Sequence, residues 1–302
     1  MQQSPRPHPL NNTFQTVQGG IAESEVFRRA MQADVVILAE KHDNRYHHGL
    51  QQKLLKALVE HGRRPALGME MFSRDQTSLL MQYIDPPVHG KPMTEEALRR
   101  ALNMEEDGLP WQQYAPLFRQ LKASGSPAFG IDLPVALRAR LGALGEDKLL
   151  PVERRQLPET EDADPLYRKV MFERIRASHC GWGPEPYLRK LFRVWQARNQ
   201  TMAEQIAAML ETDRRPVVVI VGNGHTDYNL GLISRLKSLR PDVSILNMGL
   251  LETETDKPHA EAYLFDSRFP ERPRYDVVYL APPETVPEDL CAAFNQRRIT
   301  KP

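Results

Sequence analysis

The sequence predicts an α/β fold with a mainly parallel sheet flanked by helices and carrying additional helical insertions. Short runs rich in β-branched residues alternate along the chain with longer segments in which apolar residues repeat at helical spacing. The runs DVVILAE and PVVVIV show no polar alternation, as expected of strands that are buried on both faces. Neither an internal repeat nor a low-complexity tract interrupts the pattern.

The first half of the chain begins with a predicted strand at residues 34–40. A helix follows, in which Leu50, Leu54 and Leu58 repeat at helical spacing until Gly62 provides a stop. The further elements predicted in this half are a strand at 64–72, a helix at 75–83, helical pieces within 94–124 broken at DGLP, a weaker strand at 126–134 and a helix at 135–142.

The second half opens with a stretch rich in proline and charge, residues 142–165, which indicates a loop or insertion boundary. The elements predicted after it are helices at 165–178 and 186–212, a strand at 216–221, a helix at 228–239, and strands at 242–248 and 275–281. We therefore expect one α/β domain. Its bounds are residues 20–285, with helical insertions at about 84–124 and 142–212, a polar N-terminal tail over 1–19, and a C-terminal helix or tail over 286–302.

The amino-acid composition limits the classes of partner that the chain is expected to bind. The chain has 302 residues, is 41% hydrophobic and carries a net charge of +1 from 40 basic and 39 acidic residues. This balance gives no general attraction to nucleic acid, so no nucleic-acid partner is expected.

No stretch approaches the roughly 20 apolar residues of a membrane span. The start, MQQSPRPHPLNN, has no apolar core of a signal peptide and no lipid-bearing cysteine. The cytoplasm is the default location, and a periplasmic or membrane-anchored location follows if a signal segment has been removed.

The two cysteines, Cys180 and Cys291, lack C-x-x-C spacing. A cysteine metal site is therefore not expected. Two free thiols are favoured over one long-range disulfide.

Polar side chains follow four of the predicted strands at the point where each strand ends. Because the carboxyl ends of parallel strands meet at one edge of a sheet, these side chains should converge on one site. In chain order they are Glu40 and His42, Glu70, Asp132, and then Asn223, His225 and Asp227.

Each of these residues also has a structural interpretation. Glu70 could pair with Arg74, one turn further on, and Asp227 could cap the next helix. Asn199 lies on the apolar stripe of the predicted helix 186–212, where a buried amide needs partners. It either supports the site or is satisfied by a neighbouring carbonyl.

Two kinds of chemistry suit the set. His42, Glu70 and His225 could hold a divalent metal such as Mn, Fe or Zn. Alternatively, the same residues together with Glu40 could act as general acids and bases without metal. A Ser-His-Asp site is poorly supported because the chain has no G-x-S-x-G, and GNGHTDYNLG lacks the third glycine of a dinucleotide site.

Several longer segments resemble ChaN-like proteins, the haem-binding uptake proteins of the Tiki superfamily. They are VILAEKHDNRYHHGLQQKLL, PALGMEMFSRDQ, WQQYAPLFRQLKASG, MAEQIAAML and VVVIVGNGHTDYNLGLISRL, in the family's order across residues 30–250. The combination of EMFSRDQ with GNGH is specific, whereas either alone would be weak.

The resemblance implies an α/β fold, haem binding and a role in iron acquisition, often in a membrane-anchored lipoprotein, with a haem-sharing homodimer as precedent. Distant Tiki and TraB relatives carry paired G-x-x-H motifs and a glutamate in a metal-dependent, protease-like site, which here would be Ala39–His42, Gly222–His225 and Glu70. Three departures stand out: Ala39 replaces a glycine, Asp132 stands where asparagine is expected, and the lipoprotein cysteine is absent.

Haem iron is ligated in proteins by Tyr or His, among other side chains. The candidates near the expected site are Tyr46, His47, His48, Tyr83, His89 and Tyr228. His47 shares the stripe of Leu50 and Leu54, which favours a packing role for it. The favoured function is therefore haem binding in iron or haem uptake. The alternative is a metal-dependent hydrolase that uses Glu40, His42, Glu70 and His225, and the sequence leaves open whether the protein is an enzyme.

Overall fold

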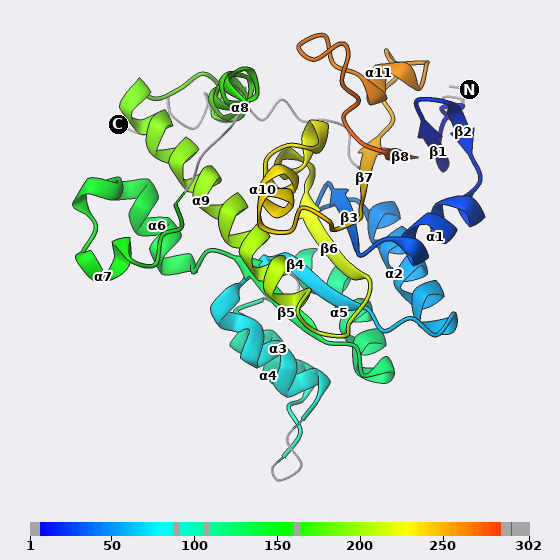
Figure 1. Cartoon of the computed structure of the whole chain (residues 1–302), viewed down its shortest axis with the longest axis horizontal. Helices are drawn as coiled ribbons and strands as arrows, with labels where there is room; N and C mark the ends of the chain where they lie inside the picture. The colour runs from blue at the N-terminus through cyan, green and yellow to red at the C-terminus, as the bar shows by residue number, and fades with distance from the viewer. Residues whose placement is uncertain (1–6, 87–90, 105–108, 160–163, 285–290, 292–302) are drawn as a thin grey trace, which may run out of the picture.

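The computed structural model describes residues 7–86, 91–104, 109–159, 164–284 and 291. Their strands form one eight-stranded sheet in the order β2-β1-β8-β7-β3-β6-β4-β5 (Figure 1). The strands are β1 (Thr13–Thr16), β2 (Gly19–Ile21), β3 (Val35–Glu40), β4 (Ala66–Ser73), β5 (Ala128–Asp132), β6 (Val217–Gly222), β7 (Ile245–Glu252) and β8 (Val277–Ala281). The six strands from β8 to β5 are parallel to one another, whereas β1 is antiparallel to both β2 and β8. The prediction of a mainly parallel α/β fold is confirmed.

Helices surround this sheet, and the longest of those described spans 25 residues. The helices are α1 (Glu23–Gln32), α2 (Arg45–Glu60), α3 (Thr77–Ile84), α4 (Glu95–Ala101), α5 (Leu109–Ser124), α6 (Val135–Leu144), α7 (Pro151–Arg154), α8 (Pro165–Ser178), α9 (Glu185–Met209), α10 (Leu232–Leu239) and α11 (Glu261–Leu264). Short 3-10 turns join them, η1 (Arg74–Gln76), η2 (Glu146–Lys148), η3 (Asn223–His225) and η4 (Asp227–Asn229). The longest, α9, runs across the front of the sheet in Figure 1.

The two faces of the sheet are covered by different helices. Val36 and Leu38 of β3 face a core cluster shared with α1 to α5, while Val35 and Ile37 face a second cluster shared with α9 and α10. Every residue of β3 is buried. Burying one such aliphatic side chain stabilises the fold by roughly 1.5–3 kcal/mol, so the continuous apolar runs fix the central strands.

The observed elements agree with most of the predicted ones within a few residues. One exception follows β6, where the helix expected from residue 228 begins only at Leu232. Tyr228 and Asn229 have φ angles of 64° and 56°, which an α-helix does not accept, and the chain forms η3 and η4 instead. The prediction also missed β1, β2 and α1. Strand β1 lies within the expected N-terminal tail and adds to the sheet through β8.

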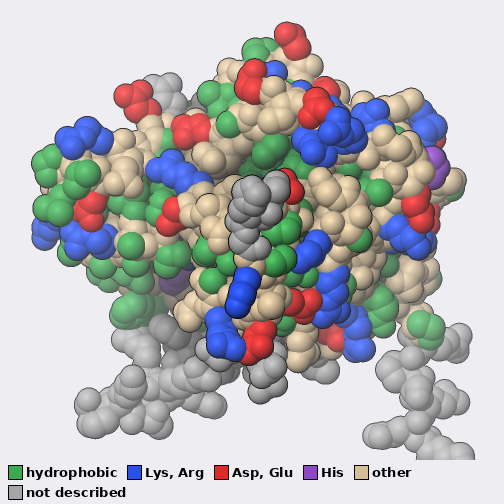
Figure 2. Space-filling model, turned by 90° about the horizontal axis from the view of Figure 1, so that it is seen from below, with side chains coloured by type: hydrophobic (Ala, Val, Ile, Leu, Met, Phe, Trp, Pro, Cys, Tyr) green, Lys and Arg blue, Asp and Glu red, His purple; other side chains and the backbone are tan. Residues whose placement is uncertain are grey.

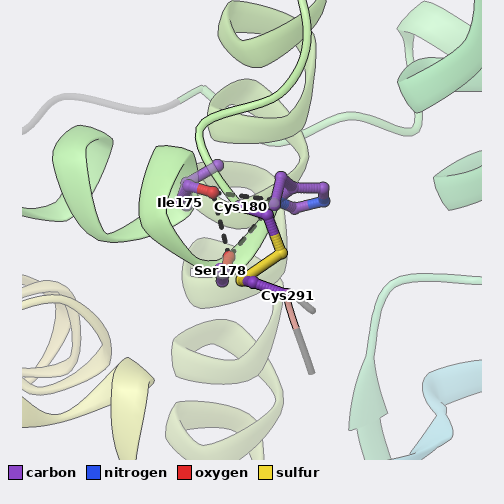
Figure 3. The surroundings of a disulfide bond; sticks show 5 residues. Ile175, Ser178, Cys180 and Cys291 are labelled. Carbon is purple, nitrogen blue, oxygen red and sulfur yellow. Dashed lines mark hydrogen bonds between the residues drawn. A yellow bond between two sulfur atoms is a disulfide. The ribbon is translucent and has the colours of Figure 1, made fainter. Parts of the chain in front are cut away.

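The two cysteines form a disulfide, Cys180–Cys291, so the expectation of free thiols is wrong (Figure 3). The partners are 111 residues apart in sequence, but the fold brings their Cα atoms to 5.3 Å. Cys180 directly follows the end of α8, near Ile175 and Ser178 in Figure 3. The disulfide therefore ties the C-terminal part of the chain to the α8 end. Apart from Cys291, the expected tail at 286–302 lies outside the described residues.

The surface carries both signs of charge. Figure 2 shows Lys and Arg side chains intermingled with Asp and Glu on the face seen from below. Among the helices that the structure describes, none combines the length and apolar character needed to cross a bilayer.

Candidate functional site

The carboxyl ends of β3, β4 and β6 meet at a cleft of about 410 Å³. Glu40 and His42 reach it from β3, Glu70 from β4 and His225 from the turn after β6. The opposite wall comes from α8 and α9, where the apolar side chains of Met171, Ile175 and Trp195 lie beside Arg174 and Ser178. The structure thus brings together these four of the seven residues that the sequence placed at the strand ends.

Glu40 fixes the ring of His42. The Nδ1 atom of His42 lies 2.9 Å from Glu40 Oε1. The buried Glu40 carboxylate also accepts a hydrogen bond from the Tyr114 hydroxyl at 2.5 Å and one from the Gln51 amide. Because a carboxylate only accepts, His42 Nδ1 carries the proton and Nε2 is the atom left free. The His42 side chain is 51% exposed, so that atom is accessible from the cleft.

Asn199 fixes the ring of His225 in a similar way. Its amide oxygen lies 2.9 Å from His225 Nδ1, and its amide nitrogen donates to the Trp195 carbonyl at 3.1 Å. Both interpretations of Asn199 from the sequence therefore apply together. Since the amide oxygen is the acceptor, His225 Nδ1 also carries its proton. The His225 ring stacks on Trp195 with 6.2 Å between ring centres.

Glu70 lies between the two imidazoles. Its Oε1 is 3.3 Å from His225 Nε2 and its Oε2 is 3.9 Å from His42 Nε2. It accepts hydrogen bonds from Arg198 at 2.6 Å and from the Gly222 backbone N–H at 2.5 Å. Burial opposes the charged form of Glu70, but the positive charges of His225, Arg198 and His42 outweigh it and hold the pKa of Glu70 well below its ordinary range.

Arg198 is the site residue that the sequence reasoning missed. Its Nε atom donates to both carboxylate oxygens of Asp132, at 2.9 and 3.1 Å, and its Nη2 atom donates to Glu70. The expected partner of Glu70, Arg74, instead contacts the Gln156 carbonyl at 3.4 Å. The available signal was the helical spacing of α9, since Arg198 follows Trp195 by three residues and therefore shares its face.

The divalent metal expected at His42, Glu70 and His225 is not supported. Within the described parts of the chain, no group of three or more His, Cys, Asp or Glu side chains could hold a metal ion. The physical reason is that both oxygens of Glu70 already accept hydrogen bonds from Arg198 and Gly222. The guanidinium beside them adds a positive charge that opposes a second cation.

The remaining supporting residues lie beside or beneath the cleft. Asn223 lines it. Asp227 is fully buried and lies among Arg174, Arg274 and the Tyr275 hydroxyl, so it anchors the turn after β6 rather than capping α10. This carboxylate holds the segment that presents His225.

The haem-ligand candidates differ sharply in exposure. Tyr46 is 38% exposed at the first turn of α2. The other described candidates, His47, His48, Tyr83 and Tyr228, are at most 5% exposed. His89 lies outside the described residues. Among the described candidates, Tyr46 alone can reach an external ligand without rearrangement.

The burial of His47 predicts a pH dependence of stability. Burial lowers the pKa of His47 to about 4, against ~6.5 for an unperturbed ring. As the pH falls through this window the unfolded chain takes up a proton that the folded chain refuses, so stability decreases. Between pH 7 and pH 5 we expect wild type to lose about 2 kcal/mol more unfolding free energy than His47→Gln. Urea unfolding at both pH values measures this, and parallel pH dependences would contradict it.

The amino-acid sequence over residues 26–236 matches the family described as haem-binding uptake, Tiki superfamily, ChaN. The match spans well over half of the chain. The chain belongs to this family. No curated protein matches the sequence of this ChaN-family chain.

Two solved structures show the same architecture. ChaN of Campylobacter jejuni, reported with cofacial haem binding, is 19% identical with a TM-score of 0.65, covering 88% of this chain and 95% of that one. A succinoglycan biosynthesis protein is 14% identical with a TM-score of 0.50, covering 85% of this chain and 90% of that one. At these identities the likeness shows the ChaN-like fold alone.

The structure shows why a glycine suits the second ChaN-like motif and how the first accepts an alanine. A Cβ atom at Gly222 would lie 3.2 Å from His42 Nε2 and 3.3 Å from Glu70 Oε2, so this glycine leaves room for both side chains. Ala39 instead packs in a core cluster with Tyr263 and Tyr275, where its methyl group is accommodated.

Proposed function

We propose that this ChaN-family protein binds haem and acts in haem or iron uptake. The observation that carries the proposal is the family match over residues 26–236, supported by the likeness to the fold of Campylobacter jejuni ChaN. Haem supplies an iron that takes oxygen or nitrogen ligands, a flat apolar ring and two anionic propionates.

Tyr46 fits these needs best among the described candidates, and Arg45 lies next to it. The Tyr46 ring is exposed at the start of α2, and the Arg45 guanidinium lies 5.8 Å from the ring centre. A phenolic oxygen can ligate haem iron, and a neighbouring cation suits a propionate. We therefore propose Tyr46 as the iron ligand and Arg45 as a propionate partner.

Titration with haemin should give a sharpened and shifted Soret band that saturates at a fixed stoichiometry. Tyr46→Phe removes the oxygen ligand while keeping the ring, so binding should weaken at least about tenfold, or about 1.4 kcal/mol. Visible spectroscopy measures both effects.

Tyr83→Phe is the matched control, because Tyr83 is buried beneath Lys122 and should leave the titration unchanged. A metal-free porphyrin that competes as well as haemin would show that iron ligation contributes nothing. Linear, unsaturable uptake would contradict haem binding itself.

A homodimer is the corresponding proposal for assembly, because the Campylobacter jejuni relative binds its haem cofacially. Two haems stacked face to face would give each protomer half of a shared interface. Light scattering with and without haemin should then show a doubling of mass on haem addition, whereas a constant monomer mass would contradict the shared arrangement.

A further inference from the structure

The cleft contains chemistry that haem binding through Tyr46 does not use. Two imidazoles flank one carboxylate, and each has its Nδ1 atom fixed by an oxygen of the protein, Glu40 for His42 and Asn199 for His225. We propose that this cleft is a metal-free general acid–base centre that hydrolyses uncharged carboxylic esters, with His42 as the base. The proposal stands on the cleft geometry and is independent of haem.

His42 has the geometry of a general base. Its Nδ1 atom is bound to Glu40 at 2.9 Å, and its Nε2 atom lies 3.9 Å from Glu70 Oε2, beyond hydrogen-bond distance. The Nε2 lone pair therefore remains available to a water molecule in the cleft. Glu40 is a positioning residue, because the Tyr114 hydroxyl and the Gln51 amide hold its carboxylate in place.

The nucleophile assigned to the centre is water. Ser178 lies on the cleft wall, but its hydroxyl donates to the Ile175 carbonyl at 2.9 Å (Figure 3). This hydroxyl lies on α8, across the cleft from the strand that carries His42. A base with a free Nε2 and no hydroxyl bound to it activates water directly.

The charges around the cleft indicate the substrate class. Glu40 and Glu70 place two carboxylates at the reacting end. The cations in or beside the cleft are each paired with a further carboxylate: Lys41 with Glu252, Arg174 with Asp227 and Arg198 with Asp132. A phosphodiester anion would be repelled there, whereas an uncharged ester would not. The wall of Met171, Ile175 and Trp195 suits an apolar group on the ester.

Atoms and electrons balance in the proposed reaction, which uses only water, the ester and His42. The oxygen of water bonds to the acyl carbon while His42 Nε2 takes a proton from it. The bond between the acyl carbon and the alcohol oxygen then breaks, and its electron pair stays on that oxygen. His42 returns the proton to the leaving oxygen, so the products are a carboxylic acid and an alcohol.

Activated esters test the centre, because a working base must accelerate them whatever the natural substrate. The haem-free protein should hydrolyse p-nitrophenyl acetate, butyrate or octanoate with saturation, and His42→Gln should lower kcat on the order of 10²-fold. The matched control is His61→Gln, since His61 is exposed at the far end of α2 and should retain full activity.

A folded His42→Gln protein with unchanged activity would overturn the proposal. So would a wild-type protein that hydrolyses none of the three esters faster than His42→Gln does. Thermal unfolding and the haemin titration show whether the variant is folded. Because His42 does not take part in the proposed haem contacts, failure of hydrolysis leaves the haem result intact, and the reverse also holds.

The pH profile separates positioning by Glu40 from a purely structural role. Burial lowers the pKa of His42, but the hydrogen bond to Glu40 and the charges of Glu70 and Glu40 outweigh it, so that pKa is raised. Activity should therefore rise with pH through this raised value, and Glu40→Gln should move the rise to lower pH as well as reducing kcat. An unmoved profile would contradict the assigned role of Glu40.

The charged or titratable groups around His42 are Glu40 and Lys41 of the β3 end, His48 of α2, Glu70 of β4, Arg174 of α8, Arg198 of α9 and His225.

Discussion

Asp227→Ala should lower the free energy of unfolding by about 3–5 kcal/mol. The Asp227 carboxylate is fully buried and accepts hydrogen bonds from Arg174, Arg274 and the Tyr275 hydroxyl. Burial opposes its charged form, but the two guanidiniums outweigh it and lower the pKa of Asp227. Alanine would leave two largely buried positive charges without a counter-charge. Urea unfolding at neutral pH measures the loss.

Asp242→Ala is the matched control, because Asp242 is exposed and its loss should change stability by less than about 0.5 kcal/mol. Asp227→Asn tests the cause, since it keeps the shape of the side chain but removes the charge. If Asp227→Asn were as stable as wild type, the charge would contribute nothing and hydrogen bonding alone would hold the turn.

Loss of the Cys180–Cys291 disulfide should cost about 2–4 kcal/mol. The bond closes a covalent loop across 111 positions of sequence, so it restricts the unfolded chain strongly. Urea unfolding with and without reductant measures the effect.

The double variant Cys180→Ser/Cys291→Ser provides the control, since its stability should equal that of the reduced wild type and should not respond to reductant. Identical unfolding curves for oxidised and reduced wild type would contradict a stabilising bond.

The central part of the fold was predictable because its physical signal is local. The apolar runs of β3 and β6 are buried on both faces, and only a strand within a parallel sheet covered by helices accommodates them. By contrast, β1 is a four-residue strand whose position depends on pairing with β8 at the other end of the chain. No pattern within residues 13–16 encodes that pairing.

The same distinction applies to the site. The strand ends placed Glu40, Glu70 and His225 at one edge, since parallel topology converts positions in sequence into a shared location. The partners that set their chemistry come from elsewhere: Arg198 from α9 and Tyr114 from α5. The disulfide is a further case, because the spacing of two cysteines carries no information about the distance between them in space.

The helix α9 presents three parts of the cleft from one face. Trp195 forms the wall, Arg198 holds Glu70, and Asn199 orients His225, at spacings of three and four residues. A helix moves as a stiff rod, so these three contacts cannot shift independently. A ligand that displaces Trp195 would therefore also displace Arg198 and Asn199. The surroundings of Glu70 and His225 would then change together. The size of the molecule in the cleft would therefore affect the charge environment of Glu70 and His225 through the position of α9.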